Sequence, residues 1–107
     1  NCSFGAAQLR QHVQHLSAIA DTLVLAYPNA GLPNELGAYD EPAHETGAHL
    51  GAWAKAGLVN IVGGCCGSTP AHIAAIAAAV AGLAPRSVPA ADPVTRLAGL
   101  EPFTLPA

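Results

Sequence analysis

Two adjacent cysteines in a glycine-rich segment are the residues of this chain best suited to chemistry. Cys65 and Cys66 lie within a Gly-Gly-Cys-Cys-Gly segment, residues 63–67. They follow a short apolar run, 58–62, and precede a Ser-Thr-Pro sequence that is typical of a helix start. Thiolates between the end of a strand and the N-terminus of a helix indicate a metal site or a nucleophile.

The only other cysteine, Cys2, stands near the start of the chain. Three thiolates can hold Zn²⁺ and leave one tetrahedral position open, which is the arrangement of a catalytic zinc site. An odd number of cysteines excludes a complete set of disulfides, so we expect reduced thiols in a cytoplasmic protein. The alternatives are a vicinal disulfide or two inert buried thiols for Cys65 and Cys66, and a buried free thiol for Cys2.

A second group of possible ligands, His44, Glu45 and His49, does not form a zinc-protease motif. That motif needs two residues between the glutamate and the second histidine, so that both histidines share one helix face. Here three residues separate Glu45 from His49. We therefore expect these side chains to face solvent.

The composition limits the class of protein. The chain has 107 residues, of which 51% are hydrophobic and 10% charged, so we expect one globular domain at most. Its four Lys and Arg residues and net charge of −3 cannot form a basic stripe, and we expect no nucleic-acid partner. No stretch approaches the roughly 18 apolar residues of a membrane span, so we expect no membrane partner.

Strands and helices are predicted to alternate along the chain. Leu9, Val13 and Leu16 recur at helical spacing, which predicts a helix over 6–20. The other expected elements are strands over 22–27 and 58–62, a loop over 28–41, helices over 42–56 and 70–84, a linker over 85–93 and an extended tail over 94–107. Such alternation is typical of parallel strands covered by helices.

The candidate site residues all follow expected strands. Cys2 follows the end of a first strand, Asn29 follows the strand over 22–27, and Cys65 and Cys66 follow the next one. Chemistry in (β/α)8 barrels takes place at the carboxyl ends of the strands. Three βα units are less than half of such a barrel and the chain contains no methionine, so we expect a part of a longer protein.

Six segments occur in one order along the chain. They are Asn1-Cys2, residues 27–34 (Tyr-Pro-Asn-Ala-Gly-Leu-Pro-Asn), Tyr39-Asp40, Trp53-Ala54, residues 59–67, and residues 96–102 (Arg-Leu-Ala-Gly-Leu-Glu-Pro). Together they resemble the homocysteine-binding domain of the cobalamin-dependent methionine synthase family. The resemblance implies an α/β fold in which residues 1–84 are the C-terminal three βα units of a (β/α)8 TIM barrel. It also implies that residues 85–107 are a linker and extended tail leading toward a folate-binding domain.

The resemblance further implies ligands and partners. It implies that Cys2, Cys65 and Cys66 bind zinc and that Asn29 contacts the amino group of homocysteine. Asn29 precedes Ala-Gly in a proline-flanked loop, so a turn-forming role is an equal alternative, and the two roles are compatible. Cobalamin and folate would be held by other domains.

These observations predict a zinc-dependent homocysteine S-methyltransferase. Its homocysteine thiolate would take a methyl group from methylcobalamin, regenerated from methyltetrahydrofolate, to give methionine. We expect the isolated chain to be inactive. A methyltransferase that uses betaine or S-methylmethionine would share the cysteines but should lack the segment 96–102. An alternative of another class is a non-catalytic metal-binding or redox module with a Cys65–Cys66 disulfide.

Overall fold

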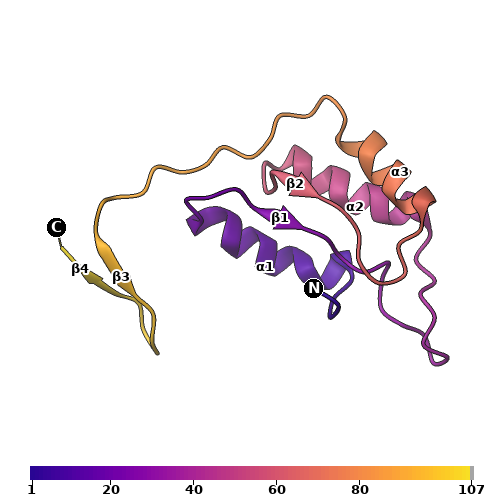
Figure 1. The fold of residues 1–107 in the computed structure, drawn as a ribbon, viewed down its shortest axis with the longest axis horizontal. Coiled ribbons are helices and arrows are strands. Elements are labelled where there is room, and N and C mark those ends of the chain that lie inside the picture. The colour runs from indigo at the N-terminus through magenta and orange to yellow at the C-terminus, as the bar shows by residue number, and fades with distance from the viewer. Residues whose placement is uncertain (107) are drawn as a thin grey trace.

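The computed structural model describes residues 1–106, in which helices alternate with short strands (Figure 1). The elements are α1 (Ala6–Ile19), β1 (Leu25–Ala26), α2 (Ala43–Lys55), β2 (Ile61–Val62), α3 (Pro70–Val80), β3 (Thr95–Leu97) and β4 (Phe103–Leu105). Strands β1 and β2 pair in parallel, with Leu25 opposite Ile61 and Ala26 opposite Val62. A parallel pair needs a crossover connection, and α2 lies within it.

The three helices begin and end close to the predicted positions. Thr69 is the N-cap of α3, where its hydroxyl accepts a hydrogen bond from the His72 amide, and Pro70 takes the first helical position as predicted. The helix ends at Val80 rather than residue 84, and Gly82 just beyond it adopts a left-handed φ of 74°. Within residues 1–106, no helix combines the length and the apolar character needed to cross a membrane.

Helices α2 and α3 pack closely because small residues face one another. A Cβ at Gly47 would lie 3.0 Å from the carbonyl oxygen of Ala75, and a Cβ at Gly51 would lie 3.2 Å from Ala79 Cβ. Both glycines are buried and lie one helical turn apart on α2. The absence of side chains at these two positions therefore allows the close approach of the helices.

The core lies between the helices and one side of the β1–β2 pair. Trp53 and Leu50 are fully buried in it. The cluster of buried side chains comprises Ala6, Val13, Ala26, Leu50, Trp53, Val59 and Ile76. Leu25 and Ile61, which lie opposite each other in the parallel pair, remain 51% and 49% exposed.

Both central strands are shorter than predicted, and Asn60 explains where they begin. Its Oδ1 accepts a hydrogen bond from the Val24 amide at 2.9 Å, in place of a backbone carbonyl. The amides of Asn60 and Ile61 both donate to the Val24 carbonyl, so regular pairing starts only after Val24. Beyond the strands, the Gly63 amide donates to Ala26 and the Cys65 amide to Pro28. Contact between the two segments thus continues up to the cysteine pair.

The segment after α3, expected to be a linker, is attached to the body of the fold through Arg86. The guanidinium is buried and donates to the carbonyls of Ser17, Ala20 and Thr22 near the end of α1. The Arg86 amide and carbonyl also bond to residues 59 and 60. Residue 86 therefore packs with the α/β part of the chain.

The tail, expected to be merely extended, forms an antiparallel hairpin of β3 and β4. Thr95 pairs with Leu105, Arg96 with Thr104 and Leu97 with Phe103. All six strand residues are exposed, and Figure 1 shows the hairpin apart from the three helices. The apolar pair of Leu97 opposite Phe103 favours this pairing across the two strands.

Candidate metal centre

The structure brings the sulfur atoms of Cys2, Cys65 and Cys66 together. The Cys2 sulfur lies 3.4 Å from that of Cys65 and 3.6 Å from that of Cys66, and the two adjacent sulfurs are 4.0 Å apart. All three residues are free cysteines, so the disulfide between Cys65 and Cys66 weighed as an alternative is not present. These are the only cysteines of the chain.

The spacing of the sulfurs fits a single small metal ion. Zinc–sulfur bonds of about 2.3 Å in tetrahedral geometry place neighbouring sulfurs about 3.8 Å apart. The observed distances of 3.4, 3.6 and 4.0 Å bracket that value. Thiolates are soft ligands that favour zinc over the hard cations calcium and magnesium. The residues present therefore fit zinc, with one coordination position left for another ligand.

Cys2 is held in a turn rather than at the end of a strand. Its φ of 64° lies in the left-handed region, which is strained for a residue with a Cβ. The Asn1 side chain maintains this turn: Oδ1 accepts from the Ser3 and Phe4 amides, and Nδ2 donates to the carbonyls of Phe4 and Tyr27. Sequence reasoning missed this role, although an asparagine preceding a turn is the usual signal for it.

Backbone contacts with the segment after β1 fix the cysteine pair. The Cys65 amide donates to the Pro28 carbonyl at 3.0 Å, and the Ala30 amide donates to the Cys66 carbonyl at 2.9 Å. Asn29 lies between them, 1% exposed, and its Oδ1 accepts from the Cys66 amide at 3.2 Å. Asn29 thus has a clear structural role beside the site, and its contact with homocysteine stays a prediction.

The thiols of Cys2 and Cys65 are electrostatically unequal. Hydrogen bonding to Cys65 and to Cys66, followed by the charges of these two groups, raises the pKa of Cys2 to about 11. The same contact with Cys2 lowers the pKa of Cys65 below its ordinary value, because a thiolate there accepts the Cys2 proton in a hydrogen bond. Without metal, Cys65 therefore ionises at lower pH than Cys2, and metal binding must displace the Cys2 proton.

Tyr39 lies against the cysteine segment. Gly67 has a φ of +81°, and a Cβ there would overlap Cβ and Cγ of Tyr39. Burial is the largest cause that raises the Tyr39 pKa, followed by the charge of Cys66 and hydrogen bonding to it. Sequence reasoning assigned Tyr39 no role beyond its place in the resemblance, because contact between residues 28 positions apart leaves no local pattern in the sequence.

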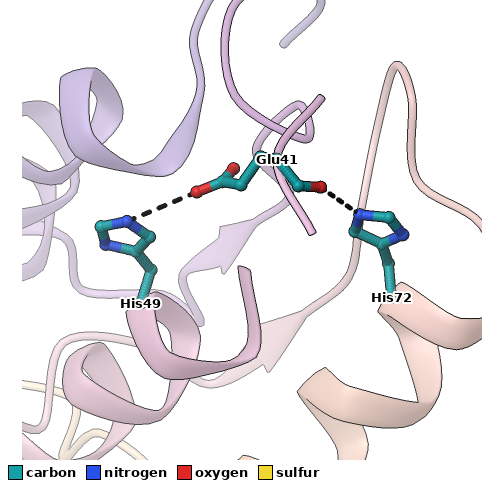
Figure 2. Close-up of polar contacts among 3 residues, drawn as sticks. All are labelled: Glu41, His49 and His72. Atoms are coloured by element: carbon teal, nitrogen blue, oxygen red, sulfur yellow. Dashed lines mark hydrogen bonds and ion pairs between the residues drawn. The ribbon is translucent and has the colours of Figure 1, made fainter. Parts of the chain in front are cut away.

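Figure 2 shows how Glu41 joins the loop that carries Tyr39 to two helices. The Nδ1 atom of His72 accepts from the Thr69 amide at 3.2 Å, so the proton of the neutral ring is on Nε2. That Nε2 donates to the Glu41 carbonyl at 2.7 Å, which links the start of α3 to the residue before the N-cap of α2. On the other side, the Glu41 carboxylate lies 3.5 Å from His49 Nε2.

The side chains of His44, Glu45 and His49 do not form a metal site within the described residues 1–106. His44 and Glu45 are exposed, as predicted. His49 departs from the prediction, because its side chain is only 39% exposed and contacts Glu41. The one cluster of metal-ligating side chains found within residues 1–106 is that of the three cysteines.

The comparison with known families covers most of the chain. The sequence profile of the homocysteine S-methyltransferase family matches residues 1–80. This range contains all three cysteines, Asn29, Tyr39 and the helices α1 to α3. Arg86 and the hairpin lie beyond it. The chain belongs to the homocysteine S-methyltransferase family.

Proposed function

We propose that this chain carries the zinc site of a methyltransferase that converts homocysteine to methionine. The observation that carries the proposal is the cluster of three free cysteine sulfurs, 3.4 to 4.0 Å apart, in a chain of this family. Cys2, Cys65 and Cys66 are the proposed ligands. Bound zinc would supply the Lewis acidity that keeps the homocysteine sulfur as a thiolate at neutral pH.

The residues of the chain have separate tasks in this mechanism. Cys2, Cys65 and Cys66 would lose their protons and hold the metal, and three protein ligands would leave room for the substrate sulfur. Asn29 holds the Cys66 amide, and we propose that it also orients the amino group of homocysteine. In the transfer, a sulfur–methyl bond forms, the donor–methyl bond breaks, and its electron pair stays with the donor. The thiol proton has left before attack.

We propose methylcobalamin, held by another domain, as the methyl donor and methyltetrahydrofolate as its source. The support is the resemblance of residues 96–102 to the connection that leads toward a folate-binding domain. Betaine or S-methylmethionine as donor is the second candidate, since it requires the same three cysteines. Methionine formation with each donor in turn distinguishes them, because only the true donor yields product.

We also propose that the α/β part of the chain belongs to a (β/α)8 barrel. Two observations support it: β1 and β2 are parallel neighbours, and Leu25 and Ile61 on one face of the pair are half-exposed. Branched apolar side chains of this kind fill the interior of such barrels. Further strands beside this pair would bury both side chains.

Replacement of one ligand tests the proposed function. In the full-length protein, Cys66→Ser should lose most of its zinc and at least 100-fold in methionine formation, because a serine hydroxyl is a poor ligand for zinc. Ser87→Ala, at an exposed position outside the site, is the matched control and should keep both its zinc content and its rate of methionine formation. Zinc content is measured by mass spectrometry of the metal, and unchanged activity in Cys66→Ser would sink the proposal.

A further inference from the structure

His72 is a buried histidine in the first turn of α3, the helix that follows the cysteine pair. On one side its Nδ1 accepts from the Thr69 amide at 3.2 Å and lies 2.8 Å from the Thr69 hydroxyl oxygen. On the other side its Nε2 donates to the Glu41 carbonyl at 2.7 Å. The residue is 8% exposed, so these bonds are largely protected from water. The ring therefore spans from the N-cap of α3 to residue 41.

Glu41 is held by its side chain as well as by its carbonyl (Figure 2). Its carboxylate lies 3.5 Å from His49 Nε2, and its side chain is 11% exposed. Gly31 packs against the same side chain, because a Cβ added there would lie 3.1 Å from Glu41 Cβ. Gly31 belongs to the loop of Asn29, whose Oδ1 accepts from the Cys66 amide. Glu41 thus joins α2, the loop after β1 and the start of α3.

The segment that carries the two adjacent cysteines is a short turn attached at both ends. At its start, the Cys65 amide donates to the Pro28 carbonyl at 3.0 Å. At its end, the Ser68 amide donates to the Cys65 carbonyl at 3.1 Å, and the next residue is Thr69. Because the turn is closed directly before Thr69, a shift of Thr69 displaces the turn with it. His72 holds Thr69 in place from outside the turn.

We propose that His72 is a positioning residue of the metal centre. Its ring ties the turn of the adjacent cysteines to Glu41, and so keeps their sulfurs at the observed distances from the sulfur of Cys2. This inference rests on the proposed zinc site, because it concerns how well the three ligands are prearranged. Ligands that are already in place bind a metal more tightly, since less ordering is needed on binding. The bond to the Glu41 carbonyl carries this effect, whereas the bond to Thr69 alone only caps the helix.

Two substitutions in the full-length protein separate the two contacts of the ring. In His72→Asn, the side-chain amide can replace Nδ1 toward Thr69 but is too short to reach the Glu41 carbonyl. In His72→Gln, the amide nitrogen takes the place of Nε2, so the bond to Glu41 is kept. Zinc should bind His72→Asn on the order of tenfold more weakly, and His72→Gln within about threefold of the unaltered protein. Affinity is measured by competition with a chelator, without substrate. The matched control is His15→Asn, at an exposed position of α1, which should leave the affinity unchanged.

Amide hydrogen exchange gives a second readout that does not depend on a substitution. If His72 couples the cysteine turn to Glu41, zinc binding should slow exchange in the segment 33–41, where the Asn34 amide donates to the Ala38 carbonyl at 2.8 Å. This zinc-dependent protection should persist in His72→Gln and be lost in His72→Asn. A merely structural role of His72 would instead change the exchange rates equally with and without zinc.

Weaker zinc binding in His72→Asn, but not in His72→Gln or His15→Asn, supports the inference. Equal affinities of the two His72 variants overturn it, and so does exchange in the segment 33–41 that zinc leaves unchanged. Should His72→Asn fail to fold, the exchange measurement on the unaltered protein and on His72→Gln decides between the same two results. If the unaltered protein binds no zinc, the proposed function fails and the inference fails with it. If it binds zinc and the two His72 variants behave alike, only the inference fails.

Discussion

Two asparagine side chains position the cysteines of the candidate metal centre. Asn1 holds the strained turn of Cys2, and Asn29 holds the amide of Cys66. A carboxamide serves here because one group supplies both a donor and an acceptor without adding charge beside the thiolates. The chemistry of the site thus depends on residues that are not ligands.

The unequal thiols give a prediction about pH. In the metal-free protein, Cys65 should react with iodoacetamide at lower pH than Cys2, because the reactive thiolate appears at Cys65 below its ordinary pKa and at Cys2 only near pH 11. Timed alkylation between about pH 7 and 10, followed by peptide mass spectrometry, measures the order. Identical pH profiles for the two residues would contradict the assigned hydrogen bond.

The cysteines could be identified from sequence, and their supporting residues could not. Adjacent cysteines between glycines, after a strand and before a helix, indicate thiolate chemistry on local grounds. Tyr39 lies against Gly67, 28 residues further along the chain. Asn1 acts through the backbone geometry of the turn at Cys2. No periodicity or short motif in the sequence encodes such contacts, so they are visible only in the folded structure.

At the scale of elements, the closeness of α2 and α3 positions both loops of the site. Helix α3 begins after the cysteine pair, and α2 begins after the loop that carries Tyr39. The helices pack through Gly47 and Gly51 against Ala75 and Ala79. A change in this packing therefore alters both loops together.

Gly47→Leu tests this dependence. The added side chain would meet the Ala75 backbone, which cannot move aside cheaply, and should lower the free energy of unfolding by about 2 kcal/mol or more. Ala52→Leu, at an exposed position of the same helix, is the control and should change it by less than about 0.5 kcal/mol. Denaturant unfolding measures both, and equal stability of the two variants would contradict the packing argument.

The starts of the helices were predictable from sequence to within one residue, whereas β1 and β2 each begin three residues later than predicted. Thr69 and Pro70 mark the start of α3, and their effect is local. The start of β1 depends instead on Asn60, whose side chain replaces a backbone partner of Val24 from 36 residues away. Strand limits follow from such distant partners.

At the scale of the whole molecule, Arg86 fastens the segment after α3 to the α/β part of the chain. Its cation lies among carbonyls near the C-terminal end of α1, where the helix dipole favours positive charge. That last turn has no basic residue of its own. An arginine between prolines looks like a surface residue in the sequence, so its burial was missed, and so was the hairpin pairing in the proline-rich tail.

Arg86→Met should therefore destabilise the fold by on the order of 3 kcal/mol, because several buried carbonyls lose a charged donor together. Arg96→Met is the matched control: Arg96 is exposed and makes one 3.4 Å contact with the Asp92 carbonyl. Arg96→Met should change the free energy of unfolding by less than about 0.5 kcal/mol. Thermal unfolding of the two variants compares them, and a neutral Arg86→Met would mean that the clustered bonds contribute no net stability.

The most direct test of the account is the coordination of zinc in the full-length protein, measured by X-ray absorption at the zinc edge. We predict three sulfur ligands at about 2.3 Å before homocysteine is added and four afterwards, because Cys2, Cys65 and Cys66 leave one position free. Four sulfurs without homocysteine, or no new sulfur on its addition, would contradict the central claim that these cysteines form an open site for the substrate thiolate.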